Sequence, residues 1–417
     1  MKLKQMRGAA VLLAATGILA ATGQSVVAVE LSMWVRESAA DPGQLMVDLW
    51  NANHDDKIVL TAIPDNQMVT KLATGVRAGD APDLVSFDLI YMPDFMRAGF
   101  LVDVTEQLEA DPNYATHVAA YKDIARYEDR IYGVGFTPDV SVLAWNKDLF
   151  ALAGLDPEQG PRSIYEIQEM ATRIGALGDD TYGFYFAGSC PGCNIFVTSP
   201  LMVAGGAKIL PRSGDDSALE GDAIPEVMRV FKEMWDAGLI PESAEVDTGA
   251  NFVSAFTAGN VGIAGTGGFL ISLMEREFPD FNYGLTLLPG LEPGQVSGFV
   301  GGDVVAIPIG GPNEAIAREF LTWVLTDEAQ LEGLAKNSIL TTRTDLADNS
   351  YFANQPKVQV TAQALAAGYV PWVFHFADMV NSDSSPWITM LQQGIFDGDI
   401  DGAIEEARAA MLEIASE

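Results

Sequence analysis

The sequence predicts an α/β protein folded into two lobes. Extended apolar runs such as LSMWV, KIVLTAI and DLVSF alternate with helical patterns near residues 44–53 and 68–77, which is typical of βαβ units around a mostly parallel sheet. A further strand and helix of the same kind occupy residues 298–308 and 314–325. Because the chain leaves one lobe and returns to it, we expect a cleft with several hinge strands behind it.

The helices are predicted from the spacing of their apolar residues. In SIYEIQEMATRI, Ser163 and Glu166 form the capping-box pattern that begins a helix. Ile164, Ile167 and Ile174 then fall on one helical face. The same spacing recurs over residues 400–411, so a helix is predicted near the C-terminus as well.

The composition is strongly acidic. The 417 residues include 57 acidic and 24 basic side chains, giving a formal net charge of −33. Nucleic-acid binding depends on clustered Lys and Arg, so the charge balance excludes a nucleic-acid partner and disfavours an anionic membrane surface.

The N-terminal residues predict export. Lys2, Lys4 and Arg7 precede a short apolar run over residues 9–20, and small residues follow up to Ala28. This is the pattern of a signal peptide, and the run is shorter than the roughly 20 apolar residues that a bilayer span needs. We expect cleavage near Ala28, no lipid anchor because no cysteine follows, and a periplasmic protein.

The chain has two cysteines, Cys190 and Cys193, in the segment GSCPGCNIF. The spacing allows a redox catalyst, half of a metal site or a local disulfide. A disulfide persists in an oxidising compartment, and no second cysteine pair is present to complete a zinc site. We therefore expect a disulfide that stiffens the loop presenting Asn194 and Phe196 to the cleft.

Polar and aromatic side chains stand at the ends of several predicted strands. Asp88 ends DLVSFD, Asp139 follows YGVGFTP, and Trp34 lies in LSMWV with Glu37 just beyond it. Open α/β sheets bind ligands at the carboxyl edge of their strands. We therefore expect these side chains at the cleft.

An ordered set of segments carries a family resemblance. RAGDAPDLVSFD, RIYGVGFTPDVSVLAWNKDLFALAGLDP, FTAGNVGIAGTGGF and GGDVVAIPIGGPNEAIAREFLTWVLTDEAQ follow one another along the chain. Together they resemble the extracellular solute-binding proteins of ABC importers, in the maltose-binding-protein-like group that binds sugars and polyols (family 1). The resemblance implies the type II periplasmic binding protein fold. Its expected parts are a signal peptide (1–28), an N-terminal lobe (29–138 plus 302–344) and a C-terminal lobe (139–301 plus 345–417).

The resemblance also implies a function. Such a protein captures a sugar, oligosaccharide or polyol between its lobes, closes at the hinge, and delivers the ligand to an ABC permease and ATPase complex. It implies a monomer that needs no cofactor and catalyses no reaction.

The chemistry of a sugar suggests which residues contact it. Carboxylates and amides suit the hydroxyls around its edge, and aromatic rings suit its C–H faces. The resemblance places Phe269 where relatives stack an aromatic ring, and places His375 near the cleft as a ligand donor or a buried structural residue. The candidate ligand-binding residues are Trp34, Glu37, Asp65, Asp88, Asp139, Asn194, Phe269, Asp303, Trp372 and His375.

Other functions stay open at this point. A secreted enzyme is the rival class, either a thiol-disulfide oxidoreductase using Cys190 and Cys193 or a hydrolase using two cleft aspartates. The excess of carboxylates leaves room for a cationic ligand such as a polyamine or a sugar amine. The same excess argues against an anionic sugar acid unless Arg36 or Arg343 faces the cleft.

Metal binding is not predicted. His54, His117 and His375 lie in very different segments, so nothing indicates that they converge. DGDIDGAIEE, from Asp397, begins like a calcium loop, but Arg408 stands where such a loop needs a bidentate Glu. We expect its aspartates to cap the final helix instead.

Overall fold

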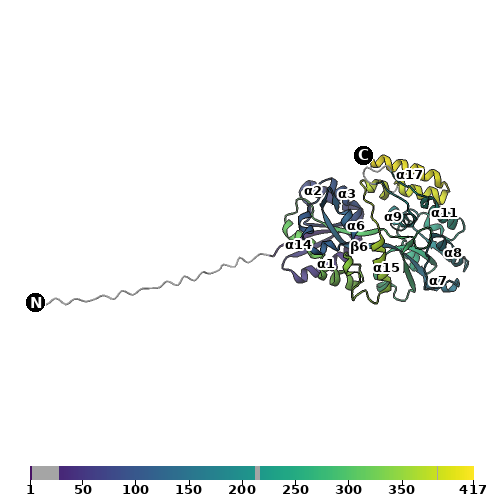
Figure 1. Ribbon diagram of the computed structural model, residues 1–417, viewed down its shortest axis with the longest axis horizontal. Coiled ribbons are helices and arrows are strands. Elements are labelled where there is room, and N and C mark those ends of the chain that lie inside the picture. Colours follow the sequence, from purple (N-terminus) through teal and green to yellow (C-terminus); the bar gives the residue numbers. More distant parts are fainter. Residues whose placement is uncertain (2–27, 212–216, 383) are drawn as a thin grey trace.

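The computed structural model describes residue 1 and residues 28–211, 217–382 and 384–417. Apart from its two ends, the predicted signal peptide therefore lies outside the described residues. Two groups of helices stand on either side of the central strand β6, one built mainly from the first third of the chain and the other from the middle and the C-terminal part (Figure 1).

A single mixed sheet connects the two groups. Its strand order is β2-β1-β3-β12-β6-β8-β7, with β9 also paired to β6. The strands are β1 (Glu30–Arg36), β2 (Lys57–Ile63), β3 (Leu84–Asp88), β6 (Gly133–Asn146), β7 (Tyr182–Tyr185), β8 (Val261–Gly267), β9 (Tyr283–Thr286) and β12 (Val300–Ala306). The pairs β1–β2, β1–β3 and β7–β8 are parallel. The central pairs are antiparallel. The sheet is therefore mixed, and the prediction of a mostly parallel sheet is wrong.

The strand β6 passes from one group of elements to the other. Its first part pairs with β12 as far as Val140 opposite Val300. From Ser141 onward it pairs with β8, and further on with β9. The predicted boundary after residue 138 stays a prediction, and this change of partner lies next to it.

Helices of the first group cover both faces of the sheet β2-β1-β3-β12. They are α1 (Ala40–Asn53), α2 (Asp65–Ala78), α3 (Met92–Arg97), α4 (Thr105–Glu109), α5 (Pro112–Ala115), α6 (Ala119–Ile124) and α14 (Glu314–Val324). One core cluster packs Trp50 of α1 against Phe320 and Trp323 of α14. The amphipathic patterns near residues 44–53, 68–77 and 314–325 thus form α1, α2 and α14, as predicted.

The second group holds the remaining α-helices of the described residues. They are α7 (Lys147–Leu152), α8 (Ile164–Gly175), α9 (Pro191–Val197), α10 (Ser199–Ala204), α11 (Ala223–Asp236), α12 (Ser254–Thr257), α13 (Leu270–Glu277), α15 (Pro356–Ala367), α16 (Pro386–Gln392) and α17 (Ile400–Ala415). Ser163 caps α8, with its Oγ accepting from the backbone N–H of Glu166 at 3.2 Å. Ile164, Ile167 and Ile174 are buried, so this predicted helix is confirmed.

Short elements complete the chain. They are η1 (Glu37–Ala39), η2 (Leu89–Tyr91), η3 (Glu242–Ala244), η4 (Glu328–Leu334), η5 (Ala335–Asn337), η6 (Thr344–Leu346), η7 (Ala377–Asn381), η8 (Gln393–Asp397), and the two-stranded pairs β4 (Arg126–Tyr127) with β5 (Arg130–Ile131) and β10 (Leu288–Pro289) with β11 (Val296–Ser297).

Candidate functional site

A cavity of about 840 Å³ lies between the two groups of elements. Arg36, Asp65 and Asp88 line it from the first group, and Phe196 and Phe269 line it from the second. This volume falls within the roughly 300–1,000 Å³ of cavities that hold small ligands. The cavity is therefore the candidate site.

Three neighbouring strands place polar side chains in a row at the cavity floor. Asp303 of β12 lies opposite Asp88 of β3 on one side and opposite Thr137 of β6 on the other. Arg36 ends β1 and reaches this row, with its Nη1 3.2 Å from Asp88 Oδ2 and its Nε donating to Asp303 Oδ1. Ser86 Oγ donates to Asp303 Oδ2 at 2.8 Å. The fully buried Asp303 is thus satisfied by two donors.

The charged side chains in this row shift one another's pKa values. Burial raises the pKa of Asp303 to about 6, and Arg36 opposes that rise. Burial also raises the pKa of Asp88, again against the effect of Arg36. Burial alone would lower the pKa of Arg36, but Asp303 and Asp88 raise it above its usual value. The guanidinium therefore stays charged and faces two carboxylates.

Thr137 ends the row with a hydroxyl that has no hydrogen-bond partner among the described residues. The residue is 5% exposed, its Oγ1 is buried without a hydrogen bond among the described residues, and it lines the cavity. An unpaired buried hydroxyl costs roughly 1–3 kcal/mol. A ligand hydroxyl that reached Oγ1 would remove that cost.

Asp139 and Phe269 form an adjacent part of the wall. Asp139 Oδ1 accepts from the backbone N–H of Phe269 at 3.3 Å. Burial raises the pKa of Asp139 to about 6, although backbone N–H groups counteract this. Phe269 is 40% exposed. An acceptor and an open aromatic ring thus lie side by side.

Four of the predicted ligand-binding residues line the cavity, namely Asp65, Asp88, Asp139 and Phe269. Asp303 contacts Arg36 directly behind the wall. The other five, Trp34, Glu37, Asn194, Trp372 and His375, are not part of the cavity wall. Trp34 is covered by α2, where Lys71 Nζ lies 4.6 Å from its ring centroid, and Glu37 is exposed at the start of η1.

The disulfide between Cys190 and Cys193 is present, as predicted. The segment that follows Cys190 is helix α9, however, and not the expected loop. Phe196 and Cys193 line the cavity. Asn194 is fully buried, and its Nδ2 donates to the carbonyl oxygens of Ala187 at 2.7 Å and of Cys190 at 3.0 Å. Its side chain therefore stabilises the helix start.

Trp372 and His375 lie in the segment between α15 and η7, and they contact the first group of elements. Trp372 Nε1 donates to the carbonyl oxygen of Arg126 at 3.2 Å. The backbone N–H of His375 donates to Asp94 at 3.1 Å, and its Nε2 lies 2.9 Å from Arg97 Nη2. These contacts join the two groups beside the cavity.

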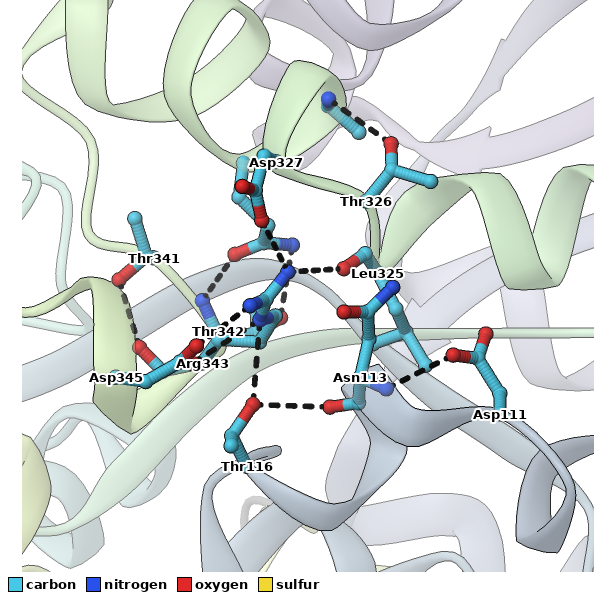
Figure 2. Close-up of polar contacts among 12 residues, drawn as sticks. Asp111, Asn113, Thr116, Leu325, Thr326, Asp327, Thr341, Thr342, Arg343 and Asp345 are labelled. Atoms are coloured by element: carbon cyan, nitrogen blue, oxygen red, sulfur yellow. Dashed lines mark hydrogen bonds and ion pairs between the residues drawn. The ribbon is translucent and has the colours of Figure 1, made fainter.

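Arg36 faces the cavity, whereas Arg343 does not. The Arg343 side chain is 6% exposed and pairs with Asp327 at 2.7 Å and Asp345 at 2.6 Å. It also donates to the carbonyl oxygen of Leu325 at 2.9 Å and to Thr116 Oγ1 at 3.2 Å, as Figure 2 shows. Arg343 therefore links the segment after α5 to the segment after α14.

The histidines have separate environments. His54 stacks on Trp50, and His117 Nε2 accepts from the backbone N–H of Gly135 at 3.0 Å. Burial lowers the pKa of His117 to about 3. Within the described ranges, no group of three or more His, Cys, Asp or Glu side chains could hold a metal ion. Asp399 accepts from Gly402 N at 3.2 Å at the start of α17, which is the predicted capping role.

The sequence of residues 37–331 matches a known family, described as bacterial extracellular solute-binding protein. The chain belongs to this family. This solute-binding protein is 24% identical over 408 residues to a Brucella abortus (strain 2308) protein named as a binding protein, and the alignment covers 95% of this chain and 96% of that protein. It is 23% identical over 332 residues to the diacetylchitobiose binding protein DasA of Streptomyces coelicolor, covering 76% and 74% of the two chains.

A solved structure is similar over nearly the whole solute-binding protein. The cyclic alpha-maltosyl-1,6-maltose binding protein from Arthrobacter globiformis superposes with a TM-score of 0.79 at 20% identity, covering 93% of this chain and 99% of that one. The predicted family resemblance and the two-lobed α/β fold are thus confirmed. No helix in the described parts of the solute-binding protein is both long and apolar enough to cross a membrane.

Proposed function

We propose that this solute-binding protein captures a neutral sugar, oligosaccharide or polyol in the cavity between its lobes and delivers it to an ABC permease and ATPase complex. The single observation that carries the proposal is the cavity wall. The hydroxyl of Thr137, which has no hydrogen-bond partner among the described residues, and the carboxylate of Asp88 line the cavity, and Asp303 pairs with both residues from behind the wall. The hydroxyls of a sugar or polyol can donate to the carboxylates of such a wall and can pair with its free hydroxyl.

The aromatic part of the wall supports the same ligand class. Phe196, Phe269, Phe299 and Phe376 line the cavity. Aromatic rings cover the C–H faces of a sugar ring, while Asp139 beside Phe269 accepts from a hydroxyl at its edge. Two of the similar proteins, DasA and the Arthrobacter globiformis protein, are named for saccharides. The UgpB protein of Salmonella typhimurium, 26% identical over 172 residues that cover 38% of this chain, is named for sn-glycerol-3-phosphate.

The proposal includes the localisation of the protein, its lobes and its ligand affinity. A signal peptide cleaved near Ala28 directs it to the periplasm, where it works as a monomer. Its lobes comprise residues 29–138 plus 302–344 and residues 139–301 plus 345–417. Hinge closure around the ligand then presents a closed form to the permease, with a micromolar or tighter affinity, which corresponds to about −8 kcal/mol or better. Ligand binding breaks no bond.

A thermal-shift panel of neutral mono- and oligosaccharides and polyols tests this function. One ligand class should raise the melting temperature as mass action requires, and mass spectrometry should recover that ligand unchanged. Asp139→Asn and Phe269→Ala should weaken binding. Asp280→Asn, which changes an exposed aspartate outside the cavity wall, should not.

Two results would contradict the proposal. One is the absence of any shift across the panel together with rapid reduction of insulin by the protein, which would favour the thiol-disulfide oxidoreductase. The other is cleavage of a bound saccharide, which would favour the hydrolase.

A further inference from the structure

The cavity wall contains two cationic side chains among its described residues, Arg36 and Arg276, and four carboxylates. Arg276 lies in α13 with 59% of its side chain exposed, and its Nη2 is 2.9 Å from Glu277 Oε1. It is therefore already paired and hydrated at the rim. Among the described residues that line the cavity, Arg36 is therefore the cationic side chain that could attract a negative charge away from the rim.

Ion pairs and hydrogen bonds hold Arg36 in place. Its Nη1 and Nε point to Asp88 and Asp303 from adjacent strands. Ser86 fixes the second oxygen of Asp303, so that this fully buried carboxylate is turned toward Arg36. Asp88 Oδ1 accepts from the backbone N–H of Ile90 at 3.3 Å, which holds Asp88 in place as well.

We propose that Asp88 and Asp303 neutralise Arg36 so that the cavity rejects anionic solutes, with Asp88 as the specificity-determining residue. The inference rests on the proposed function, because it takes the cavity as the ligand site. It adds a physical reason for the exclusion of sugar acids and sugar phosphates, and it leaves uncharged and cationic molecules as possible ligands.

The geometry explains why Asp88 decides the charge. Asp303 lies behind the wall, whereas Asp88 lines the cavity and has a side chain 27% exposed. Asp88 Oδ2 already lies 3.2 Å from Arg36 Nη1. An anion that bound to Nη1 would therefore lie close to the negatively charged carboxylate of Asp88. Asp65 and Asp139 line the same part of the wall and add to the repulsion, which is strong between charges a few ångströms apart in a partly buried site.

The test measures binding of inorganic phosphate at constant ionic strength, by calorimetry and melting temperature, with chloride as reference. The protein with Asp88 should bind phosphate no better than chloride. Asp88→Asn should bind phosphate about tenfold tighter or more, because a repelling charge is removed and Nη1 is released. The gain should disappear in Asp88→Asn combined with Arg36→Gln.

Asp41→Asn is the matched control. Asp41 lines the cavity and is exposed, so this change removes one negative charge from the cavity without releasing Arg36. It should leave phosphate binding within about twofold of the unchanged protein. An equal gain in Asp41→Asn and Asp88→Asn would overturn the proposal, since overall charge would then be the cause.

Two further outcomes would overturn it, namely tight phosphate binding by the unchanged protein and no gain in a folded Asp88→Asn. The Asn side chain still accepts from Ile90 N, and Asp88→Ser serves as a second variant, so a misfolded protein does not decide the result. The phosphate comparison also stands apart from the sugar panel. A protein that binds no sugar but shows the predicted phosphate pattern would contradict the proposed function alone.

Discussion

Thr137→Val separates the cost of an unpaired hydroxyl from its use in binding. Thr and Val have nearly the same shape, so the change removes Oγ1 and little else. Because Oγ1 is buried and has no hydrogen-bond partner among the described residues, its removal should stabilise the ligand-free protein by up to roughly 1–3 kcal/mol. Ligand affinity should fall about two- to tenfold, which corresponds to one lost hydrogen bond.

The assay is a melting curve without ligand and a calorimetric titration with the sugar found in the panel. Thr342→Val is the matched control, because Thr342 is fully buried outside the cavity wall and its Oγ1 accepts from Gln330 Nε2 at 3.0 Å. This control should lower the melting temperature and leave affinity unchanged. If Thr137→Val instead destabilises the protein as much as Thr342→Val and binds ligand normally, the hydroxyl has a partner and the reasoning is wrong.

Three further changes give expected outcomes. Burial raises the pKa of Asp139 from 3.8 to about 6, so its contribution to stability is complete below about pH 4 and is lost as the pH rises through 6. Asp139→Asn should accordingly raise the melting temperature at pH 7 and hardly at pH 4. Replacing Cys190 and Cys193 with Ser should cost about 2 kcal/mol or less, because the closed loop is short, and an unchanged affinity would show that the disulfide does not stiffen the site. Arg343→Met should lower stability by roughly 1–3 kcal/mol in a melting curve, since four hydrogen-bonding partners lose their donor.

Local patterns predicted one of these two strand ends. Asp88 ends β3 and lines the cavity there, as expected. Asp139 also lines the cavity, but the predicted strand end is wrong, because β6 continues through Asp139 to Asn146. Thr137 was missed as a ligand-binding candidate, yet a signal for it existed. Side chains two residues apart lie on the same face of a strand, so Thr137 accompanies Asp139.

A shared strand face does not by itself place a side chain in the cavity, because the distance from the end of the strand also matters. Trp34 and Arg36 lie on one face of β1, but Trp34 is about 7 Å further from the strand end, and α2 covers it. In helix α9, Phe196 lines the cavity and Asn194 does not. At 100° per residue their side chains differ in direction by about 200°, so the two could not both face the cavity.

The charge of the cavity floor follows from strand order, which no local pattern encodes. The sequence indicated that a late strand returns to the first lobe, but not which strands it joins. The insertion of β12 between β3 and β6 sets Asp303 beside both Asp88 and Thr137. Had β12 been added outside β2, Asp303 would lie away from Arg36, and Asp88 alone would balance that arginine. The second carboxylate beside Arg36 therefore depends on a contact between residues that lie more than two hundred positions apart.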